Sequence, residues 1–196
     1  MKKNILYQAI YTILLFSFLS VYGCTNYENH KNQMMVKRLY GKELDFSWPG
    51  FQVLSDTVLQ SYEINKQITV VTHIYDGLCE DCFSRYLKIA DKYVSKFHSD
   101  SVQFICIMAP RSVESIQYSL QLSGIGNSNV KVIYDKNNQY LTKNKIDKLD
   151  SGDNAFLIDE NHKIILVGDP IRSKPLNELY KNTITNMLIN KTVNDK

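Results

Sequence analysis

The chain has 196 residues, with 23 lysine and arginine residues against 20 aspartate and glutamate residues, and a formal net charge of +3. The basic residues are scattered among acidic ones instead of clustering with aromatic residues, which is typical of a solvated surface, so we expect no nucleic-acid partner. The length allows one domain with a substantial core and is too short for two comfortable ones.

The N-terminus indicates an export signal. Met1-Lys2-Lys3 is a short cationic start, and residues 5–21 are almost wholly apolar. Gly23 followed by Cys24 resembles the lipobox of bacterial lipoproteins, whose cysteine becomes the lipid-modified first residue of the mature protein. We therefore predict a signal peptide over 1–23 and a lipid on Cys24. The alternative is an uncleaved anchor, because the apolar run approaches the ~20 residues that a spanning helix needs.

Residues 25–37 are polar, rich in asparagine and without clear periodicity. We predict that residues 24–37 form a lipidated, flexible tether, with the globular domain over 38–196. Either form of anchor predicts a protein of the bacterial cell envelope, attached to a membrane with its domain outside the cytoplasm. That compartment permits disulfides.

Apolar periodicity predicts alternating strands and helices from residue 38 onward. A continuous apolar run such as Val102–Met108 is typical of a strand buried on both faces in a parallel sheet. The first predicted elements are a short strand Phe51–Leu54, a strand Ile68–Tyr75, and a helix with the apolar stripe Phe83, Leu87, Ala90, Val94 and Phe97. They are followed by the strand Val102–Met108, a helix from Ser112 to Gly124, a strand Val130–Tyr134 and a short helix around Tyr140. The last elements are a hairpin of Ala155–Ile158 and Ile164–Val167, and a helix after Ser173 with the apolar stripe Leu176, Leu179, Ile184, Met187 and Leu188.

Cys79-Glu80-Asp81-Cys82 lies where the strand Ile68–Tyr75 gives way to a helix. Two cysteines with this spacing at a helix start can close a disulfide across the first turn, and the free amide groups there stabilise a thiolate on the first of them. This is the geometry of thiol-disulfide exchange. The spacing is also compatible with half of a zinc site or a structural disulfide.

The sequence lacks the residue patterns that haem attachment or a zinc site would need. Phe83 follows the second cysteine where haem attachment would need histidine. The histidines are scattered singly and supply no second ligand pair for zinc. Cys106 lies inside an apolar strand and is predicted to be a buried small hydrophobic residue. We therefore expect no cofactor and no metal.

This order of elements resembles the thioredoxin fold, with Cys79-Glu80-Asp81-Cys82 opening the first long helix and Phe156-Leu157-Ile158-Asp159 starting a terminal hairpin. More narrowly, it resembles the membrane-tethered thioredoxin-like proteins of bacterial envelopes, in which the hairpin commonly has the sequence T-F-L-I-D-x-x-G-K-I. The segments Leu39–Phe46 and Val167–Ile171 are similar to a poorly characterised group of Bacteroidetes-type lipoproteins. The resemblance predicts an α/β domain in which helices flank a mixed central sheet, with a C-terminal β-hairpin and helix.

The resemblance implies an envelope thiol-disulfide exchange protein whose partners are thiols or disulfides of exported proteins. Cys79 would attack a partner disulfide and Cys82 would resolve the mixed disulfide. Because Glu80 and Asp81 repel a neighbouring thiolate, we expect a pair that is harder to reduce than in strongly oxidising relatives. The oligomeric state is not predicted.

One position departs from the resemblance in a way that favours another function. Asp153 stands three residues before Phe156, where the redox members of the fold carry a cis-proline. A cis bond before a non-proline residue costs about 3 kcal/mol, so we expect a trans bond and a differently shaped loop. The alternative is a non-catalytic, lipid-tethered binding module in which the Cys79–Cys82 disulfide is structural.

Overall fold

The computed structural model describes residues 33–48, 51–55, 58–74, 79–97, 100–108, 112–125, 129–146 and 155–194. The chain divides into two compact units, Met1–Leu39 and Tyr40–Lys196. In the first unit, the described residues 33–39 are helical. The predicted signal peptide and Cys24 lie outside the described residues. None of the helices in the described ranges has the length and apolar character needed to cross a membrane.

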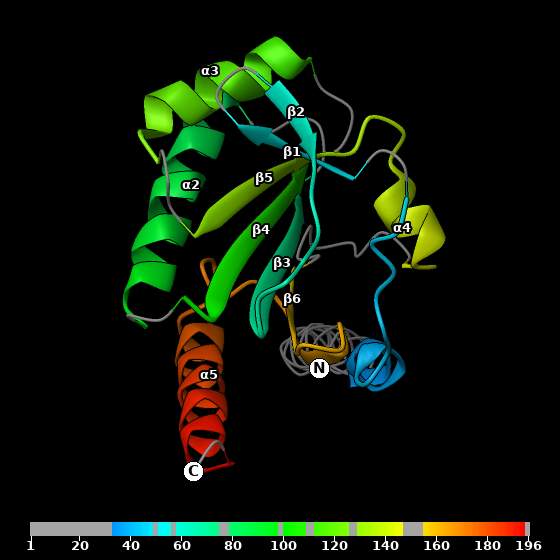
Figure 1. The fold of residues 1–196 in the computed structure, drawn as a ribbon, viewed down its shortest axis with the longest axis vertical. Coiled ribbons are helices and arrows are strands. Elements are labelled where there is room, and N and C mark those ends of the chain that lie inside the picture. The colour runs from blue at the N-terminus through cyan, green and yellow to red at the C-terminus, as the bar shows by residue number, and fades with distance from the viewer. Residues whose placement is uncertain are drawn as a thin grey trace, which may run out of the picture. The chain divides into compact units, whose positions relative to one another are not determined.

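The described part of the second unit contains a seven-stranded mixed sheet with the strand order β2-β1-β5-β4-β3-β6-β7 (Figure 1). Its central strands β3, β4 and β5 are parallel, and the remaining neighbours pair antiparallel. The strands are β1 (Gln52–Ser55), β2 (Val58–Ser61), β3 (Ile68–Ile74), β4 (Val102–Met108), β5 (Val130–Tyr134), β6 (Ala155–Ile158) and β7 (Ile164–Val167). The predicted mixed sheet and terminal hairpin are confirmed.

The helices of this unit are α2 (Glu80–Ser95), α3 (Val113–Ser123), α4 (Gln139–Lys143) and α5 (Lys174–Asn194). The limits of α3 follow from local chemistry. The Ser112 hydroxyl accepts a hydrogen bond from the Ser115 N–H at 3.1 Å, which caps the N-terminus. Gly124 ends the helix with φ +66°, a left-handed conformation that glycine adopts without a Cβ clash.

Each face of the sheet is covered. Alternate residues of β3 and β4, such as Val70 and Phe104, belong to a core cluster with residues of α2, α3 and α5. On the other face, Tyr140 belongs to an aromatic cluster and stacks on His73 of β3 with ring centroids 5.6 Å apart. The other members of this aromatic cluster are Phe46, Trp48 and Phe51. Every residue of β3 is buried, with Val70 in the core cluster on one face and His73 against Tyr140 on the other.

Three features differ from the sequence prediction. The strand β2 was not predicted, since its four residues pair only with β1 and show no apolar run. The strand β1 begins at Gln52 and not at Phe51, whose side chain is buried just before it. In α5, Leu179 was predicted on the apolar stripe but is 47% exposed, whereas Tyr180 is fully buried. The Tyr180 hydroxyl donates to the Gly168 carbonyl at 2.7 Å, which satisfies its polar group inside the core.

Candidate functional site

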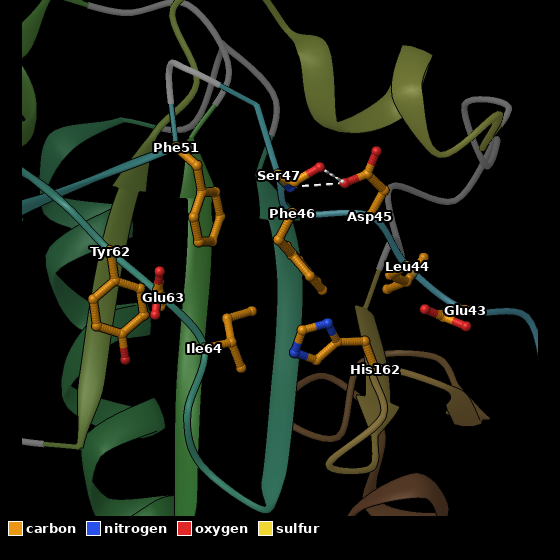
Figure 2. A pocket seen from close by; sticks show the side chains of 10 residues that line it. All are labelled: Glu43, Leu44, Asp45, Phe46, Ser47, Phe51, Tyr62, Glu63, Ile64 and His162. Atoms are coloured by element: carbon orange, nitrogen blue, oxygen red, sulfur yellow. Dashed lines mark hydrogen bonds between the residues drawn. The ribbon is translucent and has the colours of Figure 1, made fainter.

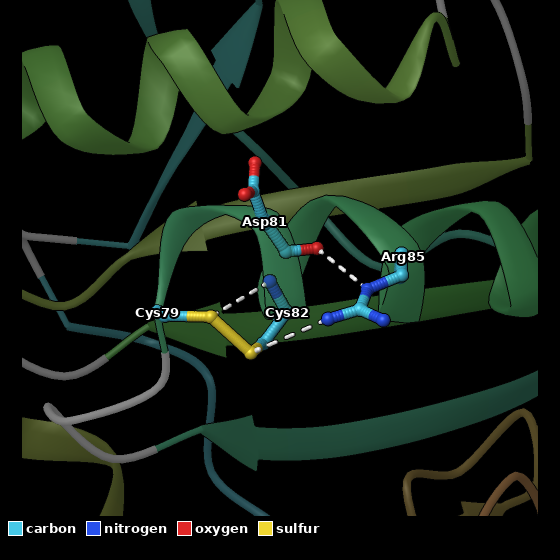
Figure 3. The surroundings of a disulfide bond; sticks show 4 residues. All are labelled: Cys79, Asp81, Cys82 and Arg85. Atoms are coloured by element: carbon cyan, nitrogen blue, oxygen red, sulfur yellow. Dashed lines mark hydrogen bonds between the residues drawn. A yellow bond between two sulfur atoms is a disulfide. The ribbon is translucent and has the colours of Figure 1, made fainter.

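Cys79 and Cys82 form a disulfide with an S–S distance of 2.11 Å, a χ3 of 81° and a Cα–Cα distance of 5.0 Å (Figure 3). The pair follows the carboxyl end of β3, which lies between β4 and β6 in the sheet. The carboxyl ends of parallel strands are where ligand and catalytic sites of α/β folds usually form. The predicted pair is therefore joined at a central strand of the sheet and at the start of α2.

Cys79 caps α2 through its own sulfur. Its backbone is extended, with φ −63° and ψ 153°, and its Sγ accepts a hydrogen bond from the Cys82 N–H at 3.1 Å. The Phe83 N–H donates to the Cys79 carbonyl at 2.9 Å, the first bond of the helix. Cys79 is exposed and Cys82 is only partly exposed. In a reduced pair, the same amide and the positive end of the helix dipole favour a negative charge on Cys79.

The two acidic residues between the cysteines are held in different ways. The Glu80 carboxylate accepts a hydrogen bond from the Ser115 hydroxyl of α3 at 2.7 Å. The Asp81 carboxylate points away from both sulfur atoms (Figure 3). Sequence reasoning predicted that both carboxylates repel a thiolate, but it did not predict that Glu80 binds α3.

Arg85 is a site residue that the sequence analysis did not identify. Its Nη2 donates to the Cys82 Sγ at 3.9 Å, and its Nε donates to the Asp81 carbonyl at 3.4 Å (Figure 3). The signal that could have found it is helical spacing, because residues three apart on a helix are surface neighbours. The guanidinium places a positive charge beside one sulfur of the pair.

A shallow pocket of about 450 Å³ lies next to the disulfide, along the junction of α2 and α3. It is lined by Asp81, Ser84, Arg85, Lys88 and Leu122. Its lining residues include two cations, and Arg85 belongs both to this pocket and to the surroundings of Cys82.

A second pocket, of about 600 Å³, is lined by aromatic side chains that include Phe46, Phe51 and Tyr62 (Figure 2). His162, in the turn between β6 and β7, also lines it. Because β6 runs antiparallel to β3, this turn lies at the opposite end of β3 from the disulfide. Neither Cys79 nor Cys82 lines this pocket.

A buried polar contact fixes α2 to the segment after β7. The Tyr86 hydroxyl donates to Asp169 Oδ2 at 3.0 Å, and the Ile171 N–H donates to Asp169 Oδ1 at 2.7 Å. Burial, together with the nearby Asp169 charge, raises the pKa of the Tyr86 hydroxyl well above its ordinary value. The same two causes raise the pKa of the Cys106 thiol. Cys106 is fully buried, as predicted, and its thiol stays protonated at neutral pH.

The remaining predicted site residues are not placed. Asp153 and Cys24 both lie outside the described residues. Within the described ranges, no group of three or more histidine, cysteine, aspartate or glutamate side chains is arranged to hold a metal ion.

Comparisons with known proteins find relatives only by structure. No protein-family model and no curated protein sequence matches the chain. A domain of a possible thiol-disulfide isomerase from Cytophaga hutchinsonii superposes with a TM-score of 0.52 at 16% identity, covering 76% of this chain and 97% of that one. The thioredoxin domain of a thiol-disulfide oxidoreductase from Bacteroides vulgatus gives a TM-score of 0.41 at 18% identity, covering 60% and 79%.

A thioredoxin-like protein from Bacteroides caccae gives a TM-score of 0.48 at 11% identity, and the match covers 72% of this chain and 50% of that one. At 16% identity, the superposition on the Cytophaga hutchinsonii domain supports a common fold and nothing finer. In this chain the seven-stranded mixed sheet carries the Cys79–Cys82 pair at the start of α2. The chain therefore has a thioredoxin-like fold.

Proposed function

We propose that this chain is a thiol-disulfide exchange protein of the bacterial cell envelope that acts on exported proteins. The observation that carries the proposal is the Cys79–Cys82 disulfide at the N-terminus of α2, with the exposed Cys79 sulfur bound to the Cys82 N–H. A purely structural disulfide with a sequence separation of 3 would add little stability, because short loops remove little entropy from the unfolded chain.

The reaction begins from the reduced pair. The Cys79 thiolate attacks one sulfur of a partner disulfide, a mixed disulfide forms, and the other partner sulfur leaves as a thiolate that takes up a proton. The Cys82 thiolate then attacks Cys79 Sγ, which breaks the mixed disulfide and releases the second partner thiol. Two electrons pass from the pair to the partner, and a dithiol reductant is needed to restore the reduced pair.

Trapping the intermediate tests this function. In Cys82→Ala the mixed disulfide on Cys79 has no intramolecular resolver, so we expect covalent adducts with envelope proteins on non-reducing gels. Cys79→Ala is the matched control and should give few adducts or none. If neither variant traps a partner and the wild-type pair stays oxidised in cells, the exchange function is wrong and the alternative, a lipid-tethered binding module with a structural disulfide, is supported.

We also propose that the mature protein begins at Cys24 and is lipid-anchored, with residues 24–37 as a tether before the domain. The apolar run of residues 5–21 and the Gly23-Cys24 sequence support this. Radiolabelled fatty acid is expected to enter the wild-type protein and not Cys24→Ser. Equal labelling of both would contradict the proposal, and an unlabelled protein that keeps its full mass would support the uncleaved anchor.

A further inference from the structure

We propose that Arg85 is a positioning residue for the second step of exchange, in which it stabilises the Cys82 thiolate and so speeds the attack of Cys82 on the mixed disulfide. The inference rests on the proposed function and assigns a role to a residue outside the Cys-x-x-Cys sequence. In this role Arg85 acts through Cys82, whose sulfur accepts its hydrogen bond.

The two sulfurs have different hydrogen-bond donors. Cys79 Sγ accepts from the Cys82 N–H at 3.1 Å, whereas Cys82 Sγ accepts from Arg85 Nη2 at 3.9 Å. The bond from Arg85 Nε to the Asp81 carbonyl, at 3.4 Å, orients the guanidinium toward Cys82 (Figure 3). The Cys82 N–H at the helix start therefore donates to the attacking sulfur of Cys79, and Arg85 donates to the resolving sulfur of Cys82.

The other charges around the pair strengthen this assignment. Glu80 is hydrogen-bonded to Ser115 of α3, and the Asp81 carboxylate points away from the sulfurs. Lys88 lines the same pocket as Arg85 but lies one helical turn further from the cysteines. From α3, the pocket receives only the uncharged Leu122. Among the described residues that line this pocket, Arg85 is the one with a cationic group bonded to Cys82 sulfur.

The expected size of the effect follows from thiol chemistry. A cation that raises the thiolate fraction of Cys82 tenfold at neutral pH also lowers the intrinsic nucleophilicity of that thiolate by about threefold, so the resolving step gains about threefold. Above the pH at which an ordinary thiol ionises, about 8.5, the gain in thiolate fraction disappears and only the lower nucleophilicity remains. The effect of Arg85 should therefore reverse its sign at high pH.

The step can be timed with 4,4′-dithiodipyridine, an uncharged disulfide, and the purified full chain in detergent. All variants carry Cys24→Ser, so that the buried Cys106 is the only other thiol. Attack by reduced Cys79 releases one 4-thiopyridone and forms a mixed disulfide. Attack by Cys82 then closes the Cys79–Cys82 disulfide and releases the second. The second release is intramolecular, and its rate is independent of reagent concentration.

We expect Arg85→Gln to slow the second release about threefold at pH 7 and to leave it equal or faster near pH 10. Arg85→Lys keeps a cation and should lie closer to wild type than to Arg85→Gln. Lys88→Gln removes the same charge one turn away and should match wild type. A slowing by Arg85→Gln that is equal at both pH values, an effect of Lys88→Gln as large, or an Arg85→Lys rate equal to that of Arg85→Gln would each overturn the role of Arg85.

The experiments distinguish failure of the proposed exchange function from failure of the role of Arg85. If Cys82→Ala traps no envelope protein, exchange with exported partners is wrong, whatever the rates with the small disulfide. If Cys82→Ala traps partners and Arg85→Gln resolves the mixed disulfide at the wild-type rate at pH 7, the exchange function stands and the inference about Arg85 fails.

Discussion

Replacing Phe83 with alanine is expected to lower the free energy of unfolding by about 3 to 5 kcal/mol. Phe83 is fully buried in the core cluster and follows Cys82 directly in the first turn of α2. The substitution removes the apolar contacts of the ring and leaves a cavity that a close-packed core fills only in part. Urea unfolding of the oxidised protein, followed by circular dichroism, measures the change.

The matched control is Ile89→Ala, which shortens another apolar side chain of α2. Ile89 is 50% exposed, so its truncation should change the free energy of unfolding by only about 0.5 kcal/mol. If the two variants lose similar stability, Phe83 does not carry the packing of α2 on the sheet, and the start of α2 would depend instead on the disulfide and the cap.

Replacing Asp135 with alanine is expected to cost about 2 to 4 kcal/mol of stability. Asp135 is 1% exposed, and its two carboxylate oxygens accept hydrogen bonds from the N–H groups of Gln139 and Tyr140, both at 2.8 Å. These are free amides at the N-terminus of α4. In the alanine variant the buried Tyr140 N–H and the partly buried Gln139 N–H lose their acceptor, and α4 loses the bonds that hold Tyr140 over the sheet.

Asp159 supplies the comparison for Asp135. One of its carboxylate oxygens also accepts two backbone N–H groups, those of Asn161 and Lys163, at 2.9 Å each, but in an exposed turn. Water can replace this carboxylate, so Asp159→Ala should cost about 1 kcal/mol or less. Asp135→Asn keeps one acceptor and should fall between the two alanine variants. Equal losses in Asp135→Ala and Asp159→Ala, measured by urea unfolding, would contradict the role of burial.

The candidate site was predictable only in part. Two cysteines with this spacing at a strand-to-helix junction can close a disulfide or form half of a zinc site, and the structure joins Cys79 and Cys82 in a disulfide. The surroundings of the pair were not predicted. The hydrogen bond from Ser115 to Glu80 depends on how α3 packs beside α2, and these residues are far apart in the sequence. The prediction of charge repulsion from Glu80 and Asp81 therefore left out two contacts of the site, the bond from α3 to Glu80 and the bond from Arg85 to Cys82.

The sequence by itself determined the elements whose signals are local. Apolar runs set β4, β5, β6 and β7, and Ser112 and Gly124 set the limits of α3, because cap bonds and side-chain periodicity act within a few residues. The tertiary structure alone decided the order of strands, the pairing of β2 with β1, and the burial of Tyr180 in place of Leu179. These features depend on contacts between distant segments. Side-chain periodicity did not place Tyr180 in the core, and its buried hydroxyl is satisfied there by the Gly168 carbonyl.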